Sequence, residues 1–267
     1  MHLSVTFIWG FGLLILAVGA AIAGMLFVRR HFDISEMRMN HDVADPLLSV
    51  VGTLFSILIG FLVAGAIQRF DEARVNVQEE AGALADVFRC SQGLPGPVRK
   101  ELQQGCLKYV DVVINEEWRM MEHKQVSAKA WDVYSGLWQS SVTFNPQTQG
   151  ESNVHQMLLE SISKLGNLRT LRFAAMNNQM PLGMWIVVFI GGAAVIAFTY
   201  FFEVKSERTQ VIMTGLVSTV MGLNLFLLAN YDYPFSGDVR VVPTAFELDR
   251  EAFFKLSHLA GEAIKPQ

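Results

Sequence analysis

The sequence has few charged residues and few cysteines, and these shortages exclude several classes of protein. Only 17% of its 267 residues are Asp, Glu, Lys or Arg, against about 25% in ordinary soluble domains. A net charge of −4 provides no basic field for a nucleic acid. Two cysteines are too few for a disulfide scaffold or a four-cysteine zinc site. The hydrophobic fraction of 51% and mean hydropathy of +0.32 indicate an integral membrane protein instead.

Motifs of the common enzyme classes are also missing. The patterns HExxH, GxSxG, GxxxxGK[ST] and GxGxxG do not occur. One loop, residues 29–46, contains side chains of the kinds that bind metals: His31, Asp33, His41, Asp42 and Asp45. Their spacing is not that of a compact tetrahedral site, so a solvated loop is the preferred interpretation. We expect no enzymatic activity, no cofactor and no metal site, and we expect Cys90 and Cys106 to be free thiols.

Four long uncharged runs are present, at residues 3–28, 47–67, 182–202 and 209–231. Each has the roughly 20 apolar residues that a helix needs to cross about 30 Å of hydrocarbon. Backbone groups in lipid must pair within their own segment, so all four are predicted to be transmembrane helices. The first run is too long for a signal peptide, and Arg29 and Arg30 follow it directly. The predicted fold is therefore an all-α membrane protein with four transmembrane helices in two pairs.

A charged segment, residues 68–180, separates the two pairs and is predicted to be a helical extramembrane domain. The second transmembrane helix should extend into it, because neither Gly nor Pro occurs from Gln68 until Gly82. Pro97 is suited to a helix start, and Ser127 and Ser152 are expected N-caps. The last helix should bury one apolar face, formed by Leu158, Ile162, Leu165, Leu168 and Leu171.

These boundaries divide the chain into a first transmembrane pair at residues 1–67, the helical domain at 68–180, a second pair at 181–231 and a C-terminal segment at 232–267. The C-terminal segment begins with turn-forming residues. It continues as an amphipathic helix with Phe246, Phe253, Leu256 and Leu259 on one face. Two arrangements are open for this helix, which either lies on the membrane or docks on the helical domain.

The second transmembrane helix carries a ridge of small residues at every fourth position. The ridge consists of Gly52, Ser56, Gly60 and Ala64. Small residues let helix backbones approach closely in lipid, so helix packing is the preferred interpretation over a pore lining.

A neighbouring stripe on the same helix combines hydroxyl groups with large apolar side chains. The stripe consists of Ser49, Thr53, Ile57 and Phe61. Hydroxyl groups above an apolar constriction suit a channel that gates by dewetting, which makes these four residues the pore-lining candidates. The alternative is a stripe that faces lipid.

Charged residues gather where the second transmembrane helix leaves the bilayer. Arg69 can extend to lipid phosphates, and Asp71 can pair with Arg74 one turn away. Glu79 and Glu80 follow, and a solvated or ion-paired helix is expected for them rather than an ion-selecting ring.

Two arginines of the helical domain are expected to form an ion pair. Arg169 and Arg172 lie three residues apart on one helix face, and Glu117 is the first candidate for their carboxylate partner. A structural ion pair is preferred here over any role in catalysis. In the fourth transmembrane helix, Asn224 is expected to bond to a neighbouring helix.

The distribution of Lys and Arg leaves the orientation in the membrane open. Five such residues flank the transmembrane helices on each side. They are denser in the two short loops, which include Arg29, Arg30, Lys205 and Arg208, and this density favours a helical domain outside the cytoplasm.

Several short motifs resemble those of the bestrophin-like domain family, bacterial membrane proteins of unknown function. The matching residues include Arg69, Asp71, Glu80, Glu117, Trp118, Arg169 and Arg172. The most specific piece is residues 232–237, which contains Pro234, Phe235 and Gly237. The resemblance covers nearly the whole chain from about His41 onward.

This family is in turn distantly similar to bestrophins, which are pentameric anion channels. The resemblance implies a homo-oligomer in the inner membrane of a bacterium, with the lipid bilayer and inorganic anions as partners. It also implies a narrow neck near Thr53, Ile57 and Phe61, and a helical domain in the cytosol. A homo-oligomeric anion channel is thus the leading hypothesis. The alternative is a non-conducting scaffold or sensor whose helical domain binds a partner.

Overall fold

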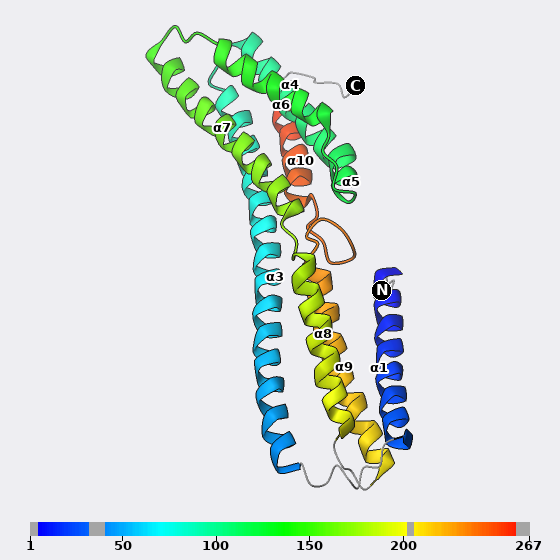
Figure 1. Ribbon diagram of the computed structural model, residues 1–267. Helices are drawn as coiled ribbons and strands as arrows, with labels where there is room; N and C mark the ends of the chain where they lie inside the picture. The colour runs from blue at the N-terminus through cyan, green and yellow to red at the C-terminus, as the bar shows by residue number, and fades with distance from the viewer. Residues whose placement is uncertain (1–4, 32–40, 202–205, 260–267) are drawn as a thin grey trace. The chain divides into compact units, whose positions relative to one another are not determined.

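The computed structural model describes residues 5–31, 41–201 and 206–259. These ranges are helices joined by turns and contain no strand (Figure 1), as predicted for an all-α protein. They form two compact units. The membrane unit consists of Met1–Gln68, Gln179–Tyr233 and Gly237–Val239, and the helical unit of Arg69–Asn178, Pro234–Ser236 and Arg240–Gln267. Asp33, one of the metal-ligand candidates, lies outside the described residues.

The membrane unit contains α1 (Val5–His31), the first half of α3 (His41–Ser91), α8 (Leu182–Phe198) and α9 (Glu207–Tyr231). Four helical stretches of the described chain are long and apolar enough to cross a membrane, and α1, α3, α8 and α9 supply their apolar parts. The four predicted transmembrane helices are therefore confirmed. Pro181 is the N-cap of α8, and a turn of 3₁₀ helix, Thr199–Phe201, follows its end.

Glycines allow the helices of the membrane unit to pack closely. Gly222 of α9 faces Leu14 of α1, and a Cβ added there would lie 2.3 Å from the leucine side chain. Gly191 of α8 faces the ring of Phe55 of α3, where a Cβ would lie at 2.5 Å. Phe55 and its neighbour Ile59 bury one face of α3 against α8.

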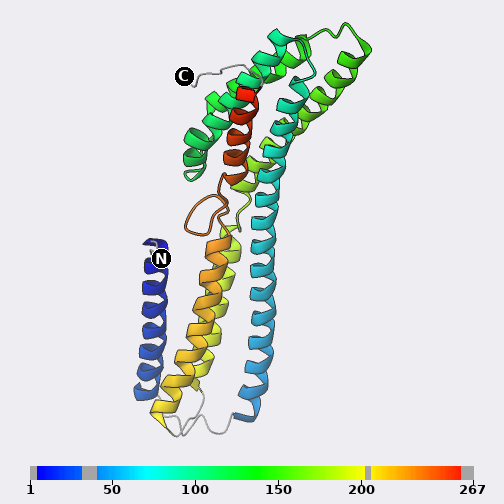
Figure 2. The same cartoon turned by 180° about the vertical axis from the view of Figure 1, so that it is seen from behind.

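The helical unit contains the second half of α3 together with α4 (Gly96–Val112), α5 (Trp118–Met121), α6 (Ala128–Thr143), α7 (Gln149–Asn177) and α10 (Thr244–Leu259). Figure 2 shows α3 as one continuous helix. A π-helical turn, Val113–Glu117, joins α4 to α5. As predicted, Pro97 lies in the first turn of α4, and the Ser127 hydroxyl caps α6 by accepting from the Ala130 N–H.

Two expectations for α7 were wrong. The N-cap of α7 is Thr148 rather than Ser152, and its hydroxyl accepts from the Glu151 N–H at 3.2 Å. The pattern from Thr148 to Glu151 matches a capping box, which identifies this earlier start. On the apolar face, Leu158 is buried but Leu171 is 42% exposed, because the face turns away from the core near the end of the helix.

The C-terminal helix α10 docks on the helical unit, which is one of its two expected arrangements. Phe253 stacks on Phe88 of α3, with ring centroids 4.2 Å apart. Phe246 is fully buried and lies edge-on to Trp118. Leu256 remains 38% exposed.

Candidate functional site

The core of the helical unit contains a cluster of buried charged and phenolic side chains, here called the charged cluster. Its members are Glu80 of α3, Tyr109 of α4, Glu117 of the π-helical turn, and Arg169 and Arg172 of α7. All five are completely buried. Buried charges are costly unless they are paired and hydrogen-bonded, so the geometry of this cluster determines what it can do.

The two arginines bind the two carboxylates in a continuous network. Arg169 donates through both terminal nitrogens to Glu117, at 2.8 and 2.6 Å. Arg172 donates to both oxygens of Glu80, at 2.6 and 3.1 Å, and its Nη2 also donates to Glu117 at 2.8 Å. Arg172 thus bridges the carboxylates, and the two positive charges balance the two negative ones.

Tyr109 completes the network. Its hydroxyl donates to Glu80 Oε1 at 2.7 Å and accepts from Arg169 Nη1 at 3.1 Å. Burial, followed by the nearby Glu80 charge, raises the pKa of Tyr109 well above its ordinary value. The phenol therefore keeps its proton and stays a donor to the carboxylate.

Aromatic rings surround the guanidinium groups. The Arg169 guanidinium carbon lies 4.9 Å from the ring centres of both Trp131 and Phe173. Arg172 lies 4.9 Å from Phe173 and 5.5 Å from Trp118. Ring faces attract desolvated cations, so these contacts help to stabilise the buried arginines.

Local helix geometry directs these groups inward. Arg169 and Arg172 are three residues apart and therefore share one face of α7. The π-helical turn places Glu117 in the core, while Glu116 next to it stays in contact with Ser127 and Lys129 at the surface. Such single π turns interrupt the ordinary period of a helix, which sequence spacing does not reveal.

The cluster has the properties of a structural clamp. For Arg172, burial lowers the pKa, but the charges of Glu80 and Glu117 outweigh it and hold the pKa above its ordinary value. No member is exposed, so none can reach a substrate from solvent. The expected ion pair between Glu117 and an arginine is present. Glu80 is ion-paired, which is one of its two expected states, and the pair is fully buried with partners in α4 and α7.

The motif at residues 232–237 and the residues just after it contact Trp118, one of the aromatic residues around the charged cluster. The indole N–H of Trp118 donates to the Val241 carbonyl at 3.2 Å, and Phe235 lies edge-on to Trp118 at 5.9 Å. The Val241 N–H donates to the Pro234 carbonyl at 2.8 Å. Gly237 has a φ of 82°, a conformation that favours glycine.

The pore-lining candidates share one uncovered face of α3 in the membrane unit. Ile57 is 51% exposed and Phe61 is 75% exposed, and Ser49 and Thr53 are exposed as well. The Thr53 hydroxyl donates to the Ser49 carbonyl at 2.6 Å, so it needs no neighbouring helix. The opposite face of the same helix is the one that packs on α8.

The small-residue ridge is next to this stripe and is not used for packing by the described part of the chain. A Cβ added at Gly52 or Gly60 would meet nothing within 4 Å, and Ser56 and Ala64 are exposed. The Ser56 hydroxyl donates to its own helix, at the Gly52 carbonyl. Packing of this ridge against another copy of the chain stays a prediction.

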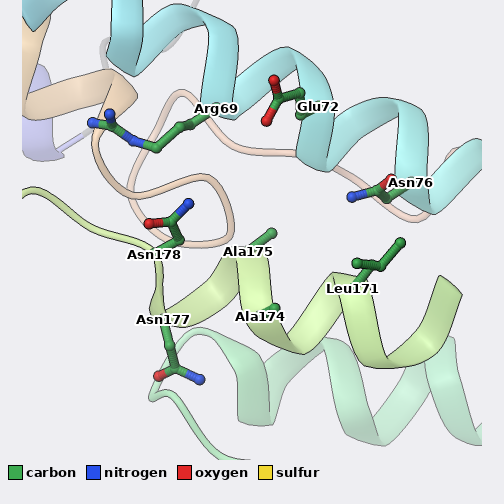
Figure 3. A pocket seen from close by; sticks show the side chains of 8 residues that line it. All are labelled: Arg69, Glu72, Asn76, Leu171, Ala174, Ala175, Asn177 and Asn178. Carbon is green, nitrogen blue, oxygen red and sulfur yellow. The ribbon is translucent and has the colours of Figure 1, made fainter. Parts of the chain in front are cut away.

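The remaining polar candidates lie at the surface, in a pocket and within the fourth transmembrane helix. Asp71 pairs with Arg74 at 3.0 Å on the surface, as expected. Arg69 lines a pocket of the helical unit (Figure 3). Within the described ranges, the Asn224 amide donates to the Val220 carbonyl one turn back in α9 rather than to a neighbouring helix.

Some residues of these sites were not anticipated from the sequence. Tyr109, Trp131 and Phe173 belong to the surroundings of the two arginines, and no sequence motif marks them. Asn76 and Asn178 line the pocket with Arg69. The only sequence signal for the role of Tyr109 is its position on the apolar face of α4, beside Cys106. A tyrosine buried on such a face needs a hydrogen-bond partner for its hydroxyl.

Comparisons with known proteins agree with this architecture. Crystal structures of a bacterial bestrophin homolog from Klebsiella pneumoniae share the fold. One, solved by Zn-SAD phasing, has a TM-score of 0.63 and 11% identity over 94% of this chain and 98% of the homolog. A variant with a tyrosine-to-alanine substitution has a TM-score of 0.65 and 10% identity over 92% and 99%.

No curated protein sequence matches the chain. The model of the bestrophin-like domain, by contrast, matches residues 12–246, which include most of α1, the other three transmembrane helices and the charged cluster. This match extends over most of the sequence. The chain therefore belongs to the bestrophin-like domain family of membrane proteins.

Proposed function

We propose that the protein is a homo-oligomeric ion channel of a bacterial inner membrane that conducts inorganic anions, with the uncovered face of α3 lining its axis. One observation carries the proposal. The stripe from Ser49 to Phe61 remains exposed in the membrane unit, and its chemistry differs from that of the other uncovered helix faces.

Those other faces are suited to lipid. Most exposed residues of α1 and α8 are apolar, and they include large side chains such as Trp9 and Phe189 as well as small residues such as Gly12 and Ala193. The α3 face differs because it adds the exposed hydroxyl groups of Ser49, Thr53 and Ser56 to its small and large apolar residues. Several copies of such a helix can approach each other closely around an axis. Family membership and the shared fold support the same assembly.

The order of side chains along α3 sets the proposed conduction path. The hydroxyl groups of Ser49 and Thr53 come first, and Ile57 and Phe61 follow one and two turns further along. An apolar ring resists wetting, and it admits an ion only when it widens. Phe61 is the largest group on the stripe, so it is the proposed gate.

Flux measurements in liposomes test this assignment. The purified full chain is reconstituted, and chloride efflux is compared for the wild type, Phe61→Ala and Ile57→Ala. We expect Phe61→Ala to raise the flux, and Ile57→Ala to raise it less, because trimming an apolar constriction eases ion entry. Phe189→Ala on α8 is the matched control, since Phe189 is also an exposed aromatic residue of a transmembrane helix, at 57% exposure.

An unchanged flux in Phe61→Ala, or an equal rise in Phe189→Ala, would contradict the channel assignment. A further variant, Gly60→Leu, tests the small-residue ridge. It should disrupt assembly, which size-exclusion chromatography with light scattering measures. An intact oligomer without flux in any variant would favour a scaffold or sensor instead.

A further inference from the structure

A polar pocket lies in the helical unit, between α3 and the C-terminal end of α7. Its volume is about 450 Å³, which is within the range of small-molecule sites. Arg69, Glu72 and Asn76 of α3 form one wall. Asn177, Asn178 and three apolar residues of α7 form the other, and Figure 3 shows the two walls facing each other across the gap.

The pocket offers groups of both charges. Arg69 and Glu72 are three residues apart and therefore neighbours on the surface of α3. Asn178 is the C-cap of α7, so the negative end of that helix dipole is directed at this side of the pocket. The carboxamides of Asn76 and Asn178 have no hydrogen-bond partner among the described residues, and each presents an oxygen as well as an amide N–H. A ligand with a negative and a positive group fits such a lining.

Both walls come from positions next to transmembrane runs. Arg69 is two residues beyond the apolar run 47–67 on the continuous helix α3. At 1.5 Å per residue, Arg69 to Asn76 extends from about 3 to 13 Å past the apolar region. Asn178 precedes Leu182, the first residue of α8, by four positions. The headgroup layer on each side of a bilayer is about 5–8 Å thick, so Arg69 and Glu72 are at its depth.

We propose that this pocket binds the headgroup of a zwitterionic phospholipid that carries a primary ammonium group, as in phosphoethanolamine. The guanidinium of Arg69 binds the phosphate. The ammonium group donates to the Glu72 carboxylate and to the carboxamide oxygens of Asn76 and Asn178. A primary ammonium has three N–H donors for these acceptors, whereas a choline group has none. Glu72 also disfavours a headgroup with only negative charge.

Native mass spectrometry of the purified full chain tests the proposal. Phosphatidylethanolamine, phosphatidylcholine and phosphatidylglycerol with identical acyl chains are titrated separately in detergent. We expect phosphatidylethanolamine to bind most tightly. Glu72→Gln should weaken this binding about tenfold, since it removes a charge-assisted hydrogen bond, and should leave phosphatidylcholine unaffected. Arg69→Gln should weaken the binding of all three lipids.

A matched control uses another carboxylate of the same helix. Glu79 is exposed and pairs with Lys164 at 3.6 Å, away from the pocket lining. Glu79→Gln should bind phosphatidylethanolamine like the wild type, and circular dichroism should show the same helix content for all variants. Equal binding of the three lipids, or no effect of Glu72→Gln, overturns the proposal. If soluble phosphoethanolamine displaced phosphatidylethanolamine when both were present at the same concentration, the assignment of the pocket to a lipid would be overturned.

Discussion

Arg172 and Glu80 form a buried ion pair across 92 residues of sequence, with Nε 2.6 Å from Oε2 and neither side chain exposed. The pair fixes α7 against α3, and Glu117 ties the same arginine to the π-helical turn. Because every charge is matched, the core of the helical unit tolerates four ionised groups. The loss of any one of them leaves an uncompensated charge in a dry environment.

Removal of one arginine should destabilise the helical unit strongly. Arg172→Ala leaves Glu80 without its guanidinium partner and Glu117 with one fewer, so we expect a loss of about 3–5 kcal/mol in the free energy of unfolding. Chemical denaturation of the detergent-solubilised protein, followed by circular dichroism, measures this change. The control is Arg74→Ala, which breaks the exposed pair with Asp71 and should cost about 0–1 kcal/mol. Equal stability of the two variants would show that the cluster is not a clamp.

The stability of the helical unit should also depend on pH through Asp249 of α10. Burial raises the pKa of this carboxyl group to about 6, the charge of Asp86 adds to the rise, and Arg89 opposes it. Between the ordinary pKa of about 4 and this value, the folded state binds the proton more tightly than the unfolded state. The stability that the protonated Asp249 side chain gives to the folded state is therefore complete below pH 4, and it is lost as the pH rises through 6.

Asp249→Asn should remove this dependence. We expect the variant and the wild type to melt alike at pH 3.5, and the variant to melt at a higher temperature at pH 7.5. Thermal unfolding in detergent across this range is the measurement. Glu247→Gln, at an exposed position of the same helix, is the control and should follow the wild type at every pH. A lower melting temperature for Asp249→Asn at pH 7.5 would contradict the prediction.

The sequence was sufficient for the helices and for part of the charged cluster. Hydropathy defines the transmembrane helices, because length and the absence of charge are local properties. The pairing of Glu117 with Arg169 could be anticipated from two arginines on one helix face. Glu80 could not be assigned to them, because its burial depends on how α3 packs against α7. Likewise, the period of one helix does not reveal what covers the α3 stripe.

The contact between the Phe55 ring of α3 and helix α8 depends on the absence of a side chain at Gly191. A Cβ at this position would lie 2.5 Å from the Phe55 ring, so Gly191→Ala must displace the ring or the helix. Overpacking of this kind typically costs about 1–3 kcal/mol. Gly183→Ala, on the same helix with nothing within 4 Å of the added Cβ, is the control. A thermal midpoint lower for Gly191→Ala than for Gly183→Ala is expected, and the reverse order would contradict this contact.

Membrane topology gives a final prediction. Since α10 docks on the helical unit, its surface and that of α6 must lie on the same side of the membrane. Ser135 of α6 and Ala252 of α10 are exposed, and Glu207 at the start of α9 is exposed at the other end of the transmembrane pair. In a Cys90→Ser background, cysteines at the first two positions should react alike with an impermeant maleimide in intact cells. A cysteine that replaces Glu207 should be accessible to the reagent only if those two cysteines are not, and the reverse.

The same labelling decides the orientation. The density of positive charge in the short loops, including Arg29, Arg30 and Arg208, favours a helical unit outside the cytoplasm, whereas similarity to bestrophins favours the cytosol. Labelling of Ser135→Cys in intact cells supports a helical unit outside the cytoplasm. Labelling only after lysis supports a helical unit in the cytosol. Equal labelling of Ser135→Cys and Glu207→Cys would contradict four membrane crossings. Among the described residues, α8 is the transmembrane helix between α7 and Glu207, so it must cross the membrane to separate them.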